Sequence, residues 1–213
     1  MAPSNQNQGD ASGHGEDRCQ LWHGQGLAEQ QRAIDIRVVH QGPFKPDTLM
    51  AKVSQVDFLL QEKAYPSAEE LAQSLLEIAT ANPDLPEDLL PRVLLALGRS
   101  EYRNKHWDQA EMHLADAYLR FREILGESHY LALEAEFESI QALRHFDYNV
   151  GYNSRLISGD MGKIALELEP RYADIVEKVY QELGEDHPLT WRVRQYYAES
   201  LALMTWALSL IHI

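Results

Sequence analysis

Cysteine and basic side chains are scarce in this sequence. Among 213 residues there is one cysteine, Cys19, which excludes an internal disulfide framework and a zinc site built on cysteines. Lysine and arginine number 19 against 33 aspartates and glutamates, so the net charge is −14 and bulk attraction to nucleic acid or to an anionic membrane is disfavoured. The apolar run 201–213 is too short to span a bilayer. With 45% hydrophobic residues, the composition is that of a soluble globular chain, which we expect to be cytoplasmic.

Motifs that carry catalysis are also missing. The sequence has no nucleophile elbow, no His-Glu-x-x-His pair and no glycine-rich dinucleotide turn. The segment 159–163, GDMGK, lacks the spacing of a phosphate loop and is interpreted as a turn before a helix. We therefore expect a protein that is not an enzyme and that holds no cofactor.

Histidines recur but do not form a metal-ligand pattern. His129 and His187 occupy equivalent places and are interpreted as helix-start packing and capping residues. His106 and His113 are seven residues apart and have no nearby cysteine or second ligand pair. No metal site is expected.

The two ends of the chain differ in composition from the rest. Residues 1–20 hold almost no apolar side chains, so we expect a disordered tail there, followed by one helical domain over 21–207. The last six residues, LSLIHI at 208–213, resemble the translation of a transposon-end adapter used in sequencing libraries, and we expect the natural chain to continue beyond Ala207. The alternative is an apolar helix end.

Two segments of the sequence repeat along the chain. The segment 63–69, KAYPSAE, aligns with 105–111, KHWDQAE, which defines a 42-residue offset. A second marker, Leu-Gly-Glu followed by Ser or Asp and then His, occurs at 125–129 and at 183–187, where the spacing is wider than this offset. The sequence therefore predicts about three and a half repeats, the third of them lengthened.

Each repeat is predicted to be a pair of antiparallel helices. Along 107–125 the apolar residues fall three or four apart, which is typical of one face of an amphipathic helix: they are Trp107, Ala110, Leu114, Ala117, Phe121 and Leu125. Leu90, Leu94, Leu97 and Tyr102 mark the preceding helix. In the third repeat, Gly and Asn within 145–153 predict a loop or a bent helix end. Because a single hairpin cannot bury its apolar face, the fold class is an all-α, right-handed solenoid of stacked helix pairs.

The order of large and small residues resembles the tetratricopeptide repeat. In this sequence Leu94-x2-Leu97-Gly98 is followed by Trp107, Ala110, Leu114 and Ala117. The 42-residue period and the Leu-Gly-x-x-His-Pro joint are similar to the kinesin-light-chain type of tetratricopeptide repeat. The resemblance covers residues 26–207, best in the second repeat and least in the third. HEAT-like repeats share the period but would not explain the Ala110-x3-Leu114-x2-Ala117 spacing.

The resemblance implies a concave groove that binds extended peptides, lined by the first helix of each pair. Transferred position by position, it places these residues on the groove: Arg92, Arg99, Tyr102, Arg103, Phe137, Gln141, Arg144, His145 and Arg192. Five arginines on one face favour an acidic peptide, since guanidinium groups bind carboxylates in fork-shaped pairs, with the chain's own carboxylates mainly on the outer helices. The alternative is that these arginines pair with acidic residues of neighbouring helices. The asparagines with which kinesin-light-chain repeats often hold a peptide backbone are absent.

These observations favour a non-catalytic interaction scaffold that binds a partner protein or peptide, an acidic peptide among the candidates. The alternative is the regulatory repeat region of a larger bacterial signalling protein, either a serine/threonine kinase or a winged-helix transcriptional regulator. Nucleic acid and membrane are not expected as partners of this region. The helix around 27–41 presents Ile34, Ile36, Val38 and Val39, so self-association through open solenoid ends is also expected.

Overall fold

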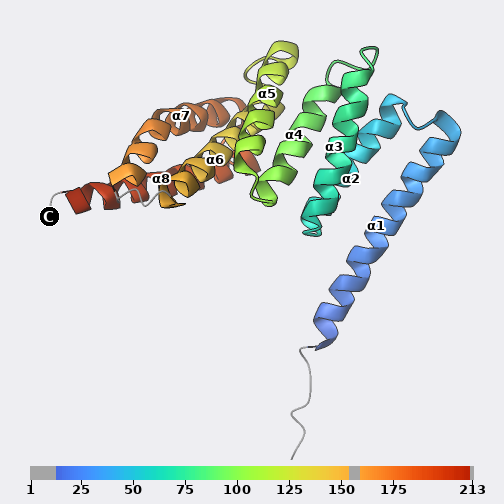
Figure 1. Cartoon of the computed structure of the whole chain (residues 1–213), viewed down its shortest axis with the longest axis horizontal. Coiled ribbons are helices and arrows are strands. Elements are labelled where there is room, and N and C mark those ends of the chain that lie inside the picture. The colour runs from blue at the N-terminus through green and yellow to red at the C-terminus, as the bar shows by residue number, and fades with distance from the viewer. Residues whose placement is uncertain (1–12, 154–158, 212–213) are drawn as a thin grey trace, which may run out of the picture. The chain divides into compact units, whose positions relative to one another are not determined.

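The structure, a computed structural model, describes residues 13–153 and 159–211, and this part of the chain is all helical. Figure 1 labels its helices, which are α1 (Gly13–Gln41), α2 (Pro46–Gln61), α3 (Tyr65–Ala81), α4 (Leu89–Arg103), α5 (Trp107–Leu125), α6 (Tyr130–Asn153), α7 (Gly159–Leu183) and α8 (Pro188–Ile211). The chain divides into two compact units, residues 1–51 and 52–213, and the division falls within α2. The predicted all-α class is confirmed.

The first unit contains α1 and the start of α2. Gly42, at φ 103°, ends α1, and the Thr48 hydroxyl donates a hydrogen bond to the Gly42 carbonyl at 3.0 Å. Ile34 is buried, whereas Ile36 and Val39 are exposed, so self-association through this helix stays a prediction. The predicted tail 1–20 overlaps α1, which begins at Gly13. A helix that is already formed gains one hydrogen bond per added residue, so few apolar side chains are needed to extend it. Residues 1–12 lie outside the described part.

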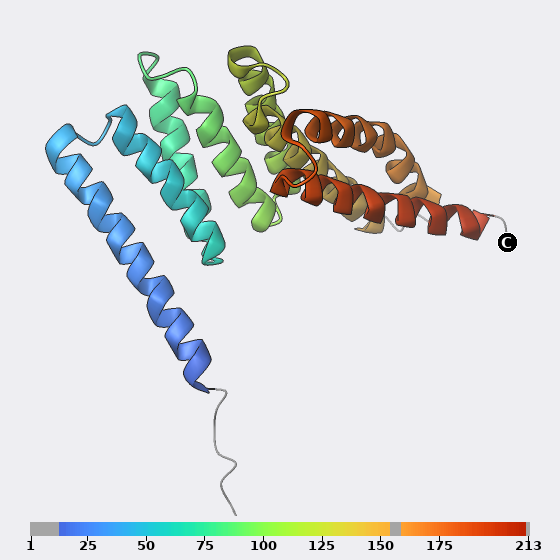
Figure 2. The ribbon, with the colours of Figure 1, turned by 180° about the vertical axis from the view of Figure 1, so that it is seen from behind.

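The second unit is a succession of helices in which each contacts the next, from α3 to α8. Figure 2 shows this order from behind. One buried cluster joins α4, α5 and α6 and includes Leu94, Leu114 and Phe121. A second joins α6, α7 and α8 and includes Phe137 and Tyr172. Each helix pair therefore completes its core with its neighbour, as the repeat pattern predicts.

Within the second repeat, α4 and α5 approach closely at Gly98. A β-carbon on Gly98 would lie 2.6 Å from Leu114 Cγ and 3.2 Å from the backbone oxygen of Ala110. Ala110, Leu114, Ala117 and Phe121 are all buried, which confirms the predicted apolar face of this helix. The small residues allow the two backbones to approach, and the large ones fill the space between them.

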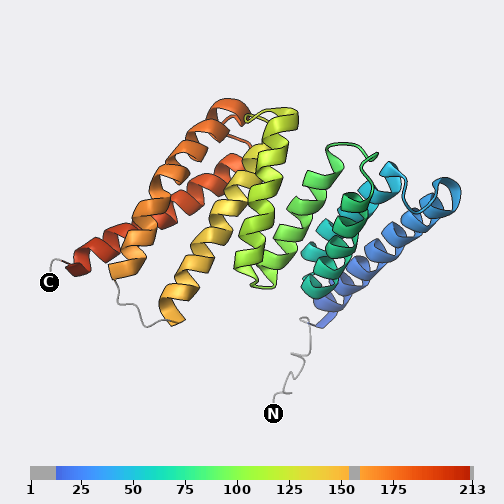
Figure 3. The same cartoon turned by 45° about the horizontal axis from the view of Figure 1, so that its top comes forward.

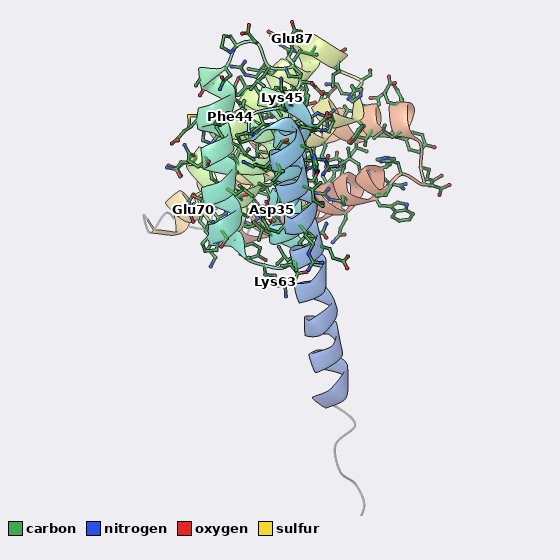
Figure 4. The ribbon with its side chains drawn as sticks, turned by 90° about the vertical axis from the view of Figure 1, so that its right-hand side faces the viewer. Asp35, Phe44, Lys45, Lys63, Glu70 and Glu87 are labelled. Atoms are coloured by element: carbon green, nitrogen blue, oxygen red, sulfur yellow. The ribbon has the colours of Figure 1, made fainter. Side chains whose placement is uncertain are left out.

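The turns inside the first two hairpins, α2–α3 and α4–α5, have the same geometry. Lys63 and Lys105, which occupy equivalent places in the two repeats, both have positive φ, at 60° and 68°. The next residue in each turn donates its backbone N–H to a carbonyl five residues back, Ala64 to Leu59 and His106 to Glu101, both at 2.9 Å. This is the helix-ending motif in which glycine is the usual residue, here built with lysine. Figure 4 labels Lys63 beyond the end of α2 and Glu70 on α3.

The joints between repeats also share their hydrogen bonds. Nδ1 of His129 accepts from the backbone N–H of Leu131, and Nδ1 of His187 accepts from that of Leu189, both at 3.2 Å. The interpretation of these histidines as helix-start capping residues is confirmed. Gly184, at φ 83°, follows the last residue of α7, as the sequence predicts.

The third hairpin differs from its neighbours in length. Helices α6 and α7 have 24 and 25 residues, against 15 and 19 in α4 and α5. Of the two alternatives predicted for 145–153, a loop or a bent helix end, the loop is wrong, because α6 continues to Asn153. Likewise 159–163 is the first part of α7 rather than a turn before it. Both errors have one cause: isolated Gly and Asn residues lower helix propensity by about 1 kcal/mol or less, which a growing helix tolerates.

At the other end of the chain, α8 continues to Ile211 and contacts α7, as Figure 3 shows. Residues 212–213 lie outside the described part. The assignment of 208–213 to an adapter sequence stays a prediction.

The contact at Gly98 gives a first test. We expect Gly98→Ala to lower the free energy of unfolding by about 1–2 kcal/mol, because the overpacking cost exceeds what alanine gains in a helix interior. Urea denaturation followed by circular dichroism measures this difference. Shortening the facing side chain by Leu114→Ala should make the two substitutions non-additive, so additive effects or a stabilised Gly98→Ala protein would contradict the close approach.

The turn at Lys105 gives a second test. Lys105→Gly should raise the free energy of unfolding by about 0.5–1 kcal/mol, because glycine has no β-carbon to strain at positive φ. Lys105→Ala is the matched control, since it removes the same side chain but keeps the β-carbon, and it should give no such gain. Equal stabilities of the glycine and alanine variants would show that φ is not the cause.

Candidate partner-binding groove

A groove of about 530 Å³ lies in the second unit, lined mainly by helices α2, α4, α6 and α8. Its lining residues are Asp57, Leu60, Gln61, Arg99, Tyr102, Arg103, Leu114, Glu134, Phe137, Glu138, Gln141, Arg192 and Tyr196. Leu114 comes from α5 and packs against Gly98, whose lack of a side chain leaves room for it at the groove. The first helices of successive hairpins therefore share one surface, as the resemblance implies.

Arg99 is the central charge of this groove. Its guanidinium contacts Glu134 at 2.9 Å and Glu138 at 2.8 Å, both on α6, and Asp57 of α2 at 3.5 Å. Burial alone would lower the pKa of Arg99, but the attraction of Glu138 and Glu134 outweighs it and raises that pKa. One side chain of α4 thus links the helices on both sides of it by charge-assisted hydrogen bonds.

Glu138 is held in its charged form by these arginines. Burial would raise the pKa of its carboxyl group, yet the attraction and hydrogen bond of Arg99, supported by those of Arg192, lower it below the ordinary value of 4.5. Two guanidinium partners keep a largely buried carboxylate charged, because opposite charges nearby favour the ionised form.

Arg192 of α8 reaches the same two carboxylates. It lies 3.5 Å from Glu134 and 3.2 Å from Glu138, and its guanidinium carbon is 5.4 Å from the centre of the Phe137 ring. Phe137 is fully buried and meets Tyr196 edge-on. The charged residues thus form a chain across the groove, from Asp57 through Arg99 and the two glutamates to Arg192.

The structure brings most, but not all, of the predicted residues to the groove. Arg99, Tyr102, Arg103, Phe137, Gln141 and Arg192 line it. Gln141 is buried and donates to the Tyr172 hydroxyl at 2.9 Å, which makes it part of the α6–α7 packing.

Arg92, Arg144 and His145 do not line the groove. Arg92 pairs with Asp88 at 2.9 Å, one turn before it, and Arg144 lies 3.9 Å from Glu199. His145 packs between the rings of Tyr102 and Trp107, with centroids 5.4 and 5.9 Å away.

The expectation that carboxylates would lie mainly on the outer helices was wrong for this groove. Asp57, Glu134 and Glu138 come from α2 and α6 and neutralise the arginines among them. Arg103 differs, because no carboxylate in the described part of the chain lies within ion-pair distance of it, and its guanidinium is 6.0 Å from the Tyr102 ring centre. The sequence carried a usable signal: Asp57 and Arg99, opposite in charge, are one repeat period apart and so occupy the same place in successive repeats.

Comparison with known proteins defines the class of fold. No family model matches the sequence, and no curated protein does either. Two crystal structures of nearly identical tetratricopeptide-like repeats from Podosopora anserina, described as kinesin light chain and one of them a point variant, are similar to this chain. The likeness has TM-scores of 0.62 and 0.61 at 13% identity, and in both cases it covers 92% of this chain and 89% of the other. The fold is therefore a tetratricopeptide-like helical repeat, similar to the repeats of these two structures.

The described residues offer neither a metal-binding cluster nor a membrane-spanning helix. Within 13–153 and 159–211, histidine, cysteine and carboxylate side chains do not gather into a group that could hold a metal ion. None of the helices in these ranges combines the length and the apolar character needed to cross a membrane.

The lowered pKa of Glu138 gives a third test. A carboxyl group with a depressed folded-state pKa contributes stability above its unfolded-state pKa, and this contribution is lost as pH falls through the folded-state value. We expect Glu138→Gln to reduce the free energy of unfolding at about pH 7 and to flatten its decline below about pH 4.5, compared with the unmodified protein.

Urea denaturation across this pH range measures both effects. Glu123→Gln, at an exposed position of α5, is the control and should leave the pH profile unchanged. A Glu138→Gln protein with the original pH dependence would contradict the coupling to Arg99.

Proposed function

We propose that this chain is a non-catalytic scaffold whose α2–α4–α6–α8 groove binds an extended segment of a partner protein. The observation that carries the proposal is the groove itself: helices from four successive repeats line one 530 Å³ hollow with both charged and aromatic side chains. Such mixed surfaces suit peptides, because aromatic side chains supply contact area and charged groups supply orientation. The fold supports this proposal, since tetratricopeptide-like repeats generally bind proteins.

An acidic side chain of the bound segment would lie against Arg103. This arginine lines the groove, is exposed, and has no carboxylate of the described chain beside it, unlike Arg99 and Arg192. The acidic-peptide hypothesis therefore rests on this one end of the groove rather than on an arginine face. The same surface would serve equally if the chain is the repeat region of a larger signalling protein.

A displayed peptide library tests the proposal. Peptides are selected on the unmodified protein, and their affinity is then measured for the double variant Gln61→Ala/Arg103→Ala, which removes two exposed groove side chains from α2 and α4. We expect affinity to fall by about tenfold or more, because each lost contact to a charged group is worth roughly a factor of ten.

The matched control is Gln73→Ala/Arg122→Ala, which removes the same residue types from exposed positions on α3 and α5. It should bind the selected peptides as the unmodified protein does. The binding surface would lie elsewhere if peptide affinity falls for the control variant. It would also lie elsewhere if peptide affinity is the same for the groove variant as for the unmodified protein. Circular dichroism of each variant confirms that helicity is unchanged.

A further inference from the structure

Two arginines share Glu134 and Glu138, but they are held very differently. Arg99 makes contacts of 2.8 and 2.9 Å, and 22% of its side chain is exposed. Arg192 reaches the same carboxylates at 3.2 and 3.5 Å, and 47% of its side chain is exposed. Arg99 is therefore a fixed part of the groove, whereas Arg192 lies loosely on its surface.

The place that Arg192 occupies is built to hold a cation. Glu134 and Glu138 are only 18% and 14% exposed, and the Phe137 ring lies beneath the guanidinium at 5.4 Å. Carboxylate oxygens beside an aromatic face are the partners that guanidinium and ammonium groups prefer. We call Glu134, Glu138 and the Phe137 ring the cation subsite.

Replacing the occupant of this subsite costs little. The contacts of Arg192 are longer than those of Arg99 and nearly half of its side chain is exposed, so they contribute little to stability. Arg192 can therefore move into water, provided that another cation takes its place beside the two carboxylates. An anion entering the same region would instead have to break the short contacts of Arg99 and leave two carboxylates unpaired. The net charge of −14 also attracts basic segments and repels acidic ones at long range.

We propose that a lysine or arginine side chain of the bound segment displaces Arg192 and occupies the cation subsite. This inference rests on the proposed function, because the segment must lie in the groove. In the free protein Arg192 then fills the place that a basic side chain of the partner takes in the complex. The bound segment therefore carries a lysine or arginine where it passes α6 and α8.

Blocked amino acids test the subsite directly. The probe is N-acetyl-arginine amide, and N-acetyl-citrulline amide, its uncharged isostere, is the matched probe. Titrations are followed by amide chemical shifts in ¹⁵N-labelled protein. Arg192→Ala vacates the subsite, so it should bind the arginine probe about tenfold more tightly than the unmodified protein and should bind citrulline no better than before.

Arg194→Ala is the matched control variant. Arg194 lies on the same helix, is 46% exposed, contacts Glu185 at 3.3 Å and stands over the Trp191 ring at 5.8 Å. The Arg194→Ala protein should bind the arginine probe no better than the unmodified protein does. Arg192→Gln, which keeps most of the side-chain length, replaces Arg192→Ala if the latter unfolds. Adding Glu138→Gln to Arg192→Ala or to Arg192→Gln should abolish the gain in affinity for the arginine probe.

The outcomes separate this inference from the proposed function. Equal gains for arginine and citrulline, a gain in Arg194→Ala, or a gain that survives Glu138→Gln would overturn the inference. If library peptides bind the groove but contain no basic residue whose contribution to affinity is lost in Glu138→Gln, the proposed function stands and the inference fails. If the peptides are indifferent to the groove variants, the proposed function fails, and the arginine titration still reports on the subsite alone.

Discussion

The second and third helix pairs, α4–α5 and α6–α7, have more apolar surface than their own two helices can cover, and the rest of the structure depends on this shortfall. Leu94 and Leu95 of α4 belong to a cluster that also includes Leu131 and Ala135 of α6, so the second hairpin completes its core with the third. The third does the same through Phe137, Leu189 and Val193. The stability of the unit therefore depends on the interfaces between hairpins. The same stacking brings α2, α4, α6 and α8 to one face, where they line the groove.

Arg99 shows how a polar group is used in such a stack. Apolar contacts are tolerant of small slides, but a guanidinium with two short carboxylate contacts on α6 and a longer one on α2 accepts few geometries. Burying these charges gains little net stability, since desolvation offsets much of the attraction. Their effect is instead geometric, because they hold α2, α4 and α6 in one register. The groove is therefore formed before a partner binds.

Local patterns of the sequence predicted local structure well. The apolar spacing along α5 and the glycine before α8 follow from helix periodicity and from backbone sterics, which depend on near neighbours alone. The continuation of α6 through 145–153 was missed, because propensity is a weak guide once a helix is already formed. Pairing of the groove arginines with carboxylates of neighbouring helices was predicted only as the alternative, and Glu138 was not identified as the partner of Arg99, for another reason. This pair joins residues 39 apart on different helices, and only the three-dimensional stacking decides whether a groove arginine faces water or a carboxylate.

The unequal length of the third hairpin has a consequence for assembly. In an array of equal hairpins, any unit could take the place of any other, and one-repeat slippage or exchange between chains would cost little. Here α6, α7 and α8 have 24, 25 and 24 residues, whereas α4 has 15, so the longer helices match one another and not their predecessors. A shift by one repeat would set α6 in the place of α4, which is roughly 13 Å shorter at 1.5 Å per residue. The unequal helix lengths therefore disfavour pairing of a hairpin with any neighbour other than its own.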